Sequence, residues 1–203
     1  MTFFDYFQIA VLVMIVTVIA FKAIYLRTTT GINPIVIGRG AEGAWRIVEL
    51  IAFGGLLLWM IEVVLHALHS PLDMFPERVP ISLLQTDGVR ILGSLVAGLG
   101  LIIFVLAFFS FGNSWRIGID RKTAGGLVTG GIFSITRNPI YVAFDLMFVG
   151  MFLLNGTWFF LIAALLAPLA VHSQIVREEK FLAQRYGDDY ESYRKTTPRY
   201  LIW

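Results

Sequence analysis

The chain has 203 residues, of which 57% are hydrophobic and 15% are charged, and its formal net charge at pH 7 is +2. This composition excludes an ordinary soluble domain and indicates an integral membrane protein. Because the sequence has no cysteine, it excludes disulfides, thiolate metal sites and a cysteine nucleophile. We predict no metal site, and nothing in the charge pattern indicates a nucleic-acid partner.

Five apolar segments are candidates for membrane-spanning helices, which need about 20 mostly apolar residues each. The last two are the shortest, and only Asn155, Gly156 and Thr157 separate them, so they are predicted to form a tight helical hairpin. The five segments are approximately residues 7–26, 47–68, 89–111, 139–154 and 158–175.

Lysine and arginine are distributed unevenly along the chain. Of these 16 residues, 14 lie in or beside the loops after the first and third segments or in the C-terminal tail, and the other two are Arg78 and Arg90. Positive residues near span ends are retained on the cytoplasmic side. We therefore predict an all-α integral membrane protein with five transmembrane helices, its N-terminus outside and its C-terminus inside.

The sequence shows no repeat of roughly 20 to 50 residues and no low-complexity linker, so residues 1–203 are predicted to form one domain. Residues 1–110 would be a three-span scaffold. Residues 111–203 would carry the chemistry, because the two segments richest in polar residues and glycine, 113–137 and 176–203, both fall on the predicted cytoplasmic side.

The first polar segment contains a glycine-rich loop followed by a helix start. Glycine pairs bracket residues 127–129, and without Cβ atoms their backbone can approach a ligand closely. Asn138 is predicted to cap the next helix and Pro139 to occupy its first position. Arg137 stands just before that helix, whose residues Tyr141 and Asp145 share one face. The alternative is a capped helix with interfacial anchors and no ligand.

The second polar segment is predicted to form the C-terminal amphipathic helices. Apolar residues recur at helical spacing up to Gly187, which would end the first helix, and Asp188 or Asp189 would cap a second. A helix lying on the membrane surface is the alternative. The adjacent carboxylates Glu178 and Glu179, at the exit of the last span, fit that alternative less well.

Taken together, these residues resemble the integral-membrane methyltransferases that include isoprenylcysteine carboxyl methyltransferase and, more remotely, phosphatidylethanolamine N-methyltransferase. The family pattern is Leu-Val, Gly-x-Tyr and Arg-His-Pro-x-Tyr, then, after a helical hairpin, Glu-Glu, Leu, Gly, Tyr-x-x-Tyr and a basic residue. The resemblance covers about residues 110–200. The matching positions, in order, are Leu127, Val128, Gly131, Phe133, Arg137, Asn138, Pro139, Ile140, Tyr141, Glu178, Glu179, Leu182, Gly187, Tyr190, Tyr193 and Arg199.

The resemblance implies that S-adenosylmethionine binds between the Leu-Val loop, the helix start and the Glu-Glu helix, while a lipophilic acceptor enters from the bilayer. Glu178 matches the glutamate that holds the cofactor in this family. Arg137 and Glu179 are expected to be catalytic. The expected cofactor-binding residues are Leu127, Val128, Gly131, Phe133, Asn138, Pro139, Ile140, Tyr141 and Glu178.

Three positions depart from the family pattern. The family histidine is Asn138, as it also is in the phosphatidylethanolamine branch, and the loop tyrosine is Phe133. Without a histidine base at that position, a carboxylate would be easier to methylate than an alcohol. The arginine that the prenylcysteine branch places four residues before its cofactor glutamate is Gln174, so the acceptor need not be prenylcysteine.

The predicted function is therefore an S-adenosylmethionine-dependent methyltransferase with its cofactor site facing the cytoplasm. Its favoured acceptor is a carboxylate on a prenylcysteine-like or other isoprenoid or lipid substrate. Three alternatives stay open: a phospholipid (ethanolamine) N-methyltransferase, an NADPH-dependent membrane reductase, and a non-catalytic membrane binding module. The reductase should supply extra cations for nucleotide phosphates. The identity of the acceptor and the oligomeric state are left open.

A few polar residues lie within the apolar segments. Glu62 and His66, at i+4 spacing, are expected to form a structural pair or line the outer boundary, and Glu49 near a span end is expected to reach the interface. His172 shares a helix face with Glu179, where it either reaches the pocket or packs between helices. Three glycines of the third segment suggest close approach of a neighbouring helix, namely Gly93, Gly98 and Gly100.

Overall fold

The computed structural model describes residues 1–31, 33–35, 44–115 and 125–201. Four basic residues counted for the orientation, Arg39, Arg116, Arg121 and Lys122, lie outside them. The described residues contain no strand, although Arg78 and Thr157 form an isolated bridge, and this confirms the all-α prediction. The helices are α1 (Phe3–Thr30), α2 (Ala44–Ala67), α3 (Asp87–Ser110), α4 (Pro139–Asn155), α5 (Trp158–Tyr186) and α6 (Asp188–Thr196), with short 3-10 turns η1 (Ser82–Gln85), η2 (Gly112–Ser114) and η3 (Gly131–Ser134).

Four of these helices, α1, α2, α3 and α5, are long and apolar enough to cross a membrane. The fifth predicted span, α4, is apolar but has only 17 residues. Large apolar side chains are exposed along the long helices, as lipid-facing surfaces require, for example Phe21, Leu95 and Leu169. The chain is thus a multi-pass membrane protein, and a membrane crossing by α4 stays a prediction.

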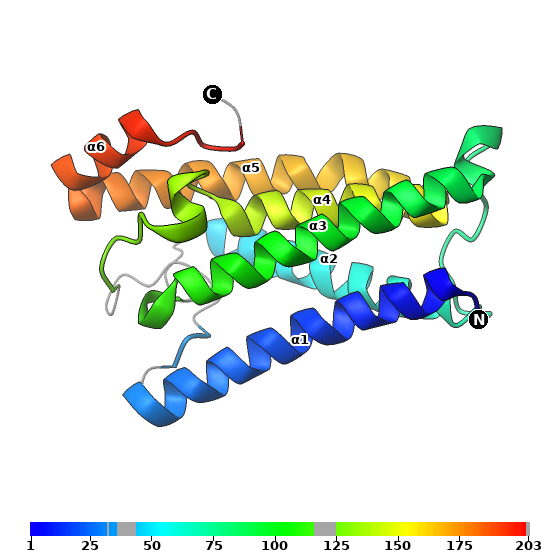
Figure 1. The fold of residues 1–203 in the computed structure, drawn as a ribbon, viewed down its shortest axis with the longest axis horizontal. Helices are drawn as coiled ribbons and strands as arrows, with labels where there is room; N and C mark the ends of the chain where they lie inside the picture. Colours follow the sequence, from blue (N-terminus) through cyan, green and yellow to red (C-terminus); the bar gives the residue numbers. More distant parts are fainter. Residues whose placement is uncertain (32, 36–43, 116–124, 202–203) are drawn as a thin grey trace.

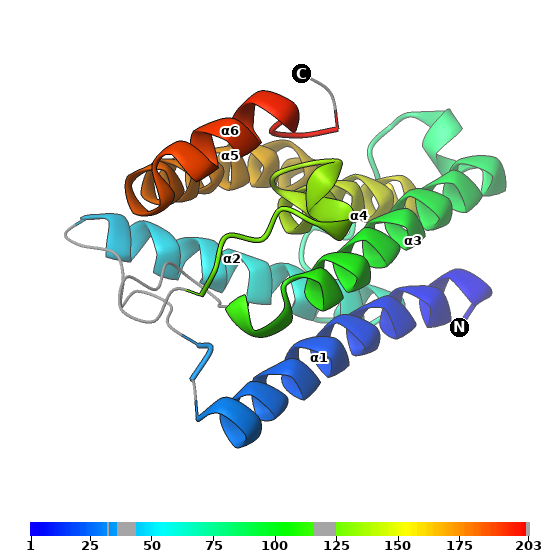
Figure 2. The ribbon, with the colours of Figure 1, turned by 60° about the vertical axis from the view of Figure 1, so that its left-hand side comes forward.

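The chain runs back and forth between two ends of an elongated bundle (Figure 1). Helices α1, α3 and α5 end where α2 and α4 begin, and α6 folds back on the last turns of α5 at this same end. We call this the pocket end, and the opposite end, which holds the N-terminus, the far end. Figure 2 shows α1 and α2 on one side of the bundle, with α5 and α6 on the other.

Helices α3 and α4 approach each other most closely, because glycines remove the side chains between them. A Cβ atom on Gly93 would lie 2.7 Å from the carbonyl oxygen of Gly150, and one on Gly100 would lie 2.7 Å from that of Ala143. The predicted packing role is confirmed for these two glycines. It is wrong for Gly98, where an added Cβ would meet only the Phe7 ring at 3.9 Å.

The hairpin between α4 and α5 forms as predicted, with Gly156 in the left-handed conformation at φ 66°. The segment before η1 covers its turn, because Val79 N donates to Gly156 O at 2.8 Å and Trp158 N donates to Glu77 O at 3.2 Å. Thr157 in the turn is only 1% exposed. The hairpin is therefore fixed at the far end.

The last predicted span ends near residue 175, and the helix itself continues past that point to Tyr186, so α5 is one helix of 29 residues. The helical pattern of the tail joins that of the span, and no helix-terminating residue intervenes before Gly187. Gly187 ends α5, as predicted, at φ 52°. The predicted capping of α6 is wrong by one residue: Gly187 is its N-cap, and Asp188 and Asp189 lie in its first turn, where they favour the helix dipole.

Candidate active site

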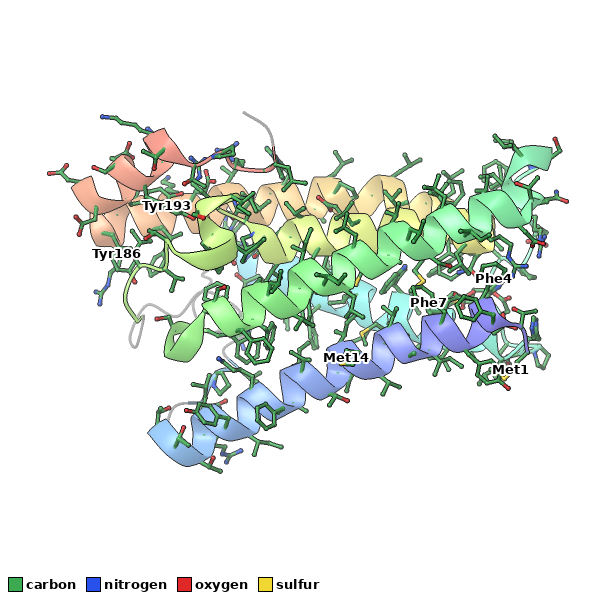
Figure 3. The ribbon with its side chains drawn as sticks, in the orientation of Figure 1. Met1, Phe4, Phe7, Met14, Tyr186 and Tyr193 are labelled. Atoms are coloured by element: carbon green, nitrogen blue, oxygen red, sulfur yellow. The ribbon has the colours of Figure 1, made fainter. Side chains whose placement is uncertain are left out.

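A cavity of about 160 Å³ lies at the pocket end, where the two polar segments of the sequence meet. Its walls come from the end of α3, the glycine loop, η3, the start of α4, the last turns of α5 and α6. Figure 3 shows Tyr186 and Tyr193 at this end and Phe4 and Phe7 at the other. The described lining residues are Phe111, Ser114, Gly125, Gly126, Leu127, Val128, Phe133, Arg137, Asn138, Glu178, Glu179, Phe181, Leu182, Tyr186, Tyr190 and Tyr193.

Most of the predicted site residues are brought together in this cavity, although they lie about 40 positions apart in the sequence. Four are not on its wall, namely Gly131, Pro139, Ile140 and Tyr141. Gly131 starts η3 at φ 62°. A Cβ atom at this position would lie 2.6 Å from Ser110 Oγ, so glycine is required here for packing. Pro139 is buried at the start of α4, and Ile140 packs against the core.

The glycine loop contributes backbone to the cavity wall, as predicted. A Cβ on Gly125 would collide with Ser114 Oγ, whereas one on Gly126 would meet no atom within 4 Å. The Tyr186 hydroxyl donates to the carbonyl oxygen of Gly125, which ties the loop to the end of α5. Leu127 and Val128 follow directly and complete this wall.

Glu178 supplies a carboxylate to the cavity and is held from two sides. Its Oε1 accepts hydrogen bonds from the Tyr141 hydroxyl at 2.5 Å and from Gln174 Nε2 at 3.2 Å. Within the described part of the chain, its second oxygen, Oε2, has no hydrogen-bond partner. Tyr141 thus acts on the site through Glu178 and does not itself line the cavity.

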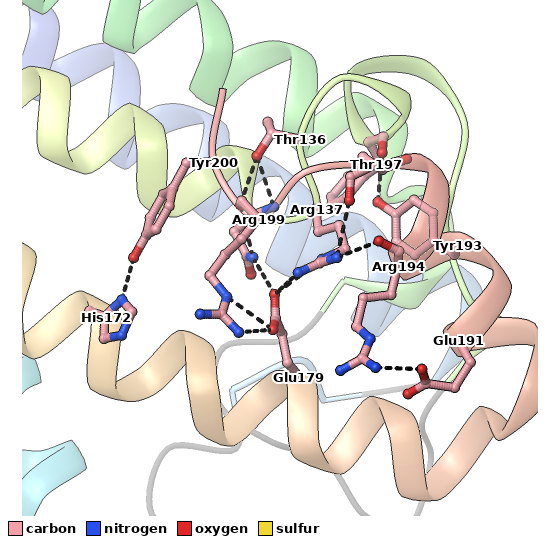
Figure 4. Close-up of polar contacts among 12 residues, drawn as sticks. Thr136, Arg137, His172, Glu179, Glu191, Tyr193, Arg194, Thr197, Arg199 and Tyr200 are labelled. Carbon is pink, nitrogen blue, oxygen red and sulfur yellow. Dashed lines mark hydrogen bonds and ion pairs between the residues drawn. The ribbon is translucent and has the colours of Figure 1, made fainter. Parts of the chain in front are cut away.

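Glu179 binds two arginines and one amide (Figure 4). Arg137 reaches Oε1 from Nε at 3.2 Å and from Nη2 at 3.0 Å, and Asn138 Nδ2 reaches the same oxygen at 3.1 Å. Arg199 binds Oε2 from Nε at 3.1 Å and from Nη2 at 2.7 Å. The Glu179 carboxylate raises the pKa of the Arg199 guanidinium, so Arg199 stays charged. This cluster closes one side of the cavity.

Arg137 also holds the end of the chain in place. Its Nη1 donates to the carbonyl oxygens of Arg194 at 2.9 Å and Thr197 at 3.0 Å, and its backbone N donates to Pro198 O at 2.9 Å. The side chains of Arg137 and Glu179 are each only 8% exposed. All three guanidinium nitrogens of Arg137 are therefore engaged by the protein itself.

Asn138 is the N-cap residue of α4, as predicted, but its side chain does not make the capping bond. The residue precedes α4, but its amide donates to Glu179 Oε1 and to Arg199 O at 3.1 Å, and it makes no capping bond. A bond to a carboxylate is stronger than a neutral capping bond. Pro139 at the first helical position has no N–H, so the helix start also has one donor fewer to satisfy.

Tyr190 is a site residue that the sequence prediction missed. It lines the cavity, is 1% exposed, and its hydroxyl has no hydrogen-bond partner in the described part of the chain. Burial, with the Glu179 carboxylate nearby, raises the pKa of Tyr190 to about 12, so the hydroxyl stays protonated and can donate. Its neighbour Tyr193 donates to Phe133 O at 2.6 Å and anchors α6 to η3. The feature of the sequence that could have identified Tyr190 was the Tyr-x-x-Tyr spacing.

The other polar residues singled out in the spans lie outside the cavity. His172 Nδ1 lies 2.6 Å from the Tyr200 hydroxyl, so it packs against the C-terminal segment (Figure 4). At the far end, His66 Nδ1 lies 2.7 Å from Asp73 Oδ2, and Glu62 Oε1 accepts from Met74 N at 2.8 Å. The expected direct pair of Glu62 and His66 is thus replaced by contacts with the loop after α2.

The sequence pattern of the phospholipid methyltransferase family matches residues 89–189, about half of the chain, from α3 to the start of α6. Protein-S-isoprenylcysteine O-methyltransferase of Schizosaccharomyces pombe is 38% identical over 76 residues, which are 36% of this chain and 31% of that relative. The match thus spans about a third of the length of this curated relative. The chain belongs to the family of integral-membrane methyltransferases that includes the isoprenylcysteine and phospholipid methyltransferases.

Proposed function

We propose that the protein is an S-adenosylmethionine-dependent methyltransferase that acts on a lipophilic acceptor from the membrane. The observation that carries this proposal is the Glu178 carboxylate. It lies in a cavity with mostly apolar and aromatic walls, and its Oε2 has no partner in the described part of the chain. A half-buried carboxylate with one oxygen that receives no hydrogen bond from the described residues favours a ligand that carries a cationic amino group.

The residues present fit this cofactor. The amino group would bind Glu178 Oε2, and the adenine would lie against Phe133, Phe181 and Leu182 beside the glycine loop. The unpartnered Tyr190 hydroxyl would donate to the carboxylate or the ribose of the cofactor. When bound, the cofactor supplies an electrophilic methyl group. The task of the protein is to align that group with the acceptor and to exclude water.

A carboxylate of a prenylcysteine-like or other isoprenoid or lipid molecule is the favoured acceptor. A carboxylate has no proton to lose before it is methylated, so it needs no general base. This agrees with the cavity wall, which contains no histidine among its described residues. The name of the Schizosaccharomyces pombe relative, a protein-S-isoprenylcysteine O-methyltransferase, supports the same class of acceptor.

The predicted catalytic residues Arg137 and Glu179 are proposed to position the cavity wall. Each lines the cavity, but their charged groups bind each other at 3.0 Å. Together with Arg199, they join the start of α4 to α5 and to the C-terminal segment. Arg137 and Glu179 would therefore affect the reaction indirectly, by maintaining the shape of the pocket.

An amine of phosphatidylethanolamine is the alternative acceptor, supported by the match to the phospholipid methyltransferase family. A reductase that binds NADPH is less well supported. The described cations nearest the cavity, Arg137 and Arg199, are both bound to Glu179, which leaves less charge for nucleotide phosphates.

The proposed membrane arrangement has five crossings, with the N-terminus outside and the pocket end in the cytoplasm. The alternating helix directions in Figure 1 and the position of most lysines and arginines at the pocket end support it. At about 1.5 Å per residue, α4 is about 26 Å long, close to the hydrocarbon thickness of about 30 Å. Residues 1–203 would form one domain, in which α3 belongs with the family core because the family match begins at residue 89.

Calorimetry on the detergent-solubilised protein tests the proposal. We expect S-adenosylhomocysteine to bind and NADPH not to bind. Incubation with methyl-labelled cofactor and a lipid extract should then label a base-labile methyl ester. A base-stable labelled phospholipid would favour the amine acceptor, and binding of NADPH alone would overturn the methyltransferase proposal.

A further inference from the structure

Two buried carboxylic acids meet at the far end of the bundle, away from the cavity. Glu62 lies near the end of α2, and Asp73 lies in the loop that follows this helix. Glu62 Oε1 accepts a hydrogen bond from Met74 N at 2.8 Å, and Asp73 Oδ2 lies 2.7 Å from His66 Nδ1. Each acid thus has one oxygen with a partner and one oxygen that these contacts do not use.

The two unused oxygens are Glu62 Oε2 and Asp73 Oδ1. Both are buried without a hydrogen-bond partner in the described part of the chain, and the two carboxyl groups lie within hydrogen-bonding reach of each other. Glu62 is 0% exposed, and the side chain of Asp73 is 12% exposed. Because ionised carboxylates only accept hydrogen bonds, two of them in contact repel each other unless a positive group lies between them.

A proton fits this position better than a metal ion. Within the described residues, no group of three or more histidine, aspartate or glutamate side chains could hold a metal. The other oxygen of each acid is already occupied, one by a backbone N–H and one by an imidazole nitrogen. A shared proton needs only the two remaining oxygens, and pairs of carboxyl groups that share one proton titrate as a unit.

The charged groups around the pair do not remove this need for a proton. His66 on α2 is the basic group at Asp73, and the Phe160 ring of α5 covers it, with 5.6 Å between the ring centroids. On the side of α1, Asp5 already binds His69 Nε2 at 3.1 Å. A protonated His66 would balance only one negative charge, so the second carboxylate would stay uncompensated.

The pair also holds a loop that is under backbone strain. His69 and Phe75, on either side of Asp73, are non-glycine residues with φ 51° each. Such conformations persist only where the surrounding contacts determine them. Further along, residues 77–79 of the same loop lie against the turn between α4 and α5. The contacts of the carboxyl pair are therefore among those that keep this loop folded against the bundle.

We infer that Glu62 and Asp73 share one proton, and that this proton locks the loop after α2 to the far end of the bundle. With the proton in place, Glu62 donates to Asp73 and both acids keep their other contacts. Loss of the proton leaves two adjacent buried negative charges without a donor, which favours release of the loop. In the proposed topology the far end lies outside, so the lock responds to external pH. The lock itself does not depend on the proposed function.

The melting temperature of the solubilised protein, measured at about pH 6 and at about pH 9, tests the lock. The wild type should melt roughly 5 °C lower, or more, at the higher pH, because proton loss breaks a buried pair. Glu62→Gln should lose much less, since its amide donates to Asp73 at every pH. This variant keeps His66 and His69, so their titration contributes equally to both proteins. Glu77→Gln, an exposed carboxylate of the same loop, is the matched control and should behave as wild type.

Infrared difference spectroscopy detects the proton directly. At about pH 7, the wild type should show the C=O stretching band of one protonated carboxyl group that Glu62→Gln and Asp73→Asn both lack. In either variant, an amide N–H takes the place of the shared proton. Glu77→Gln should keep the band, and raising the pH should remove it from the wild type.

Equal losses of melting temperature in the wild type and in Glu62→Gln would show that the inference is wrong. A melting temperature that depends on the concentration of sodium or calcium ions at constant pH would assign the position to a metal ion and also overturn it. Should Glu62→Gln not fold, Asp73→Asn takes its place, because its amide can donate to Glu62 in the same way. Absence of the wild-type carboxyl band would refute the shared proton whatever the variants do.

Discussion

Tyr141, in the first turn of α4, donates a hydrogen bond of 2.5 Å to Oε1 of Glu178 near the end of α5. This bond joins the start of α4 to the last turns of α5 and fixes which carboxylate oxygen faces the protein. Because Gln174 binds the same oxygen, Oε2 stays turned away from these donors. The Tyr141–Glu178 pair therefore presents one oxygen of fixed orientation, Oε2 of Glu178, to the cavity.

Replacing Glu178 by glutamine tests this arrangement directly. The change keeps the shape but removes the charge, so S-adenosylhomocysteine affinity should fall roughly 10- to 100-fold, as expected for loss of a charge-assisted hydrogen bond. Calorimetry measures the affinity, and the melting temperature should change little. Glu191→Gln, an exposed carboxylate on α6, is the control. Unchanged affinity in Glu178→Gln would move the cofactor site elsewhere.

Tyr141→Phe should weaken S-adenosylhomocysteine binding less, by roughly 3- to 10-fold, because it removes one hydrogen bond to a charged group without removing the carboxylate. In the double variant with Glu178→Gln, the two effects should not add, since Tyr141 acts through Glu178. Additive losses would show that Tyr141 contacts the ligand itself.

Tyr190→Phe separates binding from stability. The Tyr190 hydroxyl is buried without a partner in the described part of the chain, so its removal should leave the melting temperature of the free protein unchanged or higher. Cofactor affinity should nevertheless fall several-fold. A lower melting temperature together with unchanged affinity would assign the hydroxyl a structural role. Tyr193→Phe is the comparison, and it should destabilise the protein because that hydroxyl bonds Phe133 O.

Arg137→Lys is expected to lower the free energy of unfolding by about 1 to 3 kcal/mol, because lysine cannot bond Glu179 and two carbonyl oxygens at once. Cofactor binding and turnover should then decline together and recover at lower temperature. Arg194→Lys on the surface is the control. A loss of turnover alone, at normal stability and cofactor affinity, would instead support the direct catalytic role predicted from the sequence.

The membrane orientation can be tested with single cysteines, since the chain has none. Gln85 in η1 is exposed at the far end, and Ser192 on α6 is exposed at the pocket end. In intact cells, an impermeant thiol reagent should label Gln85→Cys but label Ser192→Cys only after permeabilisation. Thr157 in the hairpin turn is unsuitable because it is buried. The reverse labelling pattern would invert the proposed topology.

The sequence alone was sufficient to predict the helices and most of the residues that line the cavity. Long apolar segments set the spans, because a chain in lipid must satisfy its backbone within each helix. Gly156 and Gly187 marked helix ends through their freedom to adopt positive φ. Glu178, Leu127 and Phe133 were placed by motif order, and the structure brings all three to one cavity.

Other features depended on contacts between residues far apart in the sequence. Asparagine is a residue type that favours helix caps, yet the Asn138 amide binds Glu179, because α5 brings that carboxylate within 3.1 Å. Arg137 seemed free to meet a ligand, but the folded C-terminal segment occupies it with two carbonyl oxygens. The preference of a residue for a local hydrogen bond is weak compared with a bond to a charged partner. Only the tertiary structure supplies that partner.

What the sequence determines and what only the tertiary structure decides differ for a physical reason. Hydrophobic length and glycine conformation are properties of short segments, so the sequence by itself determined the all-helical membrane class and the helix ends at Gly156 and Gly187. Which donors each carboxylate receives depends on how helices pack. Only the tertiary structure could therefore decide that Glu179 is saturated by Arg137 and Arg199, that Glu178 keeps one oxygen unpartnered in the described part of the chain, and that Tyr190 faces the cavity.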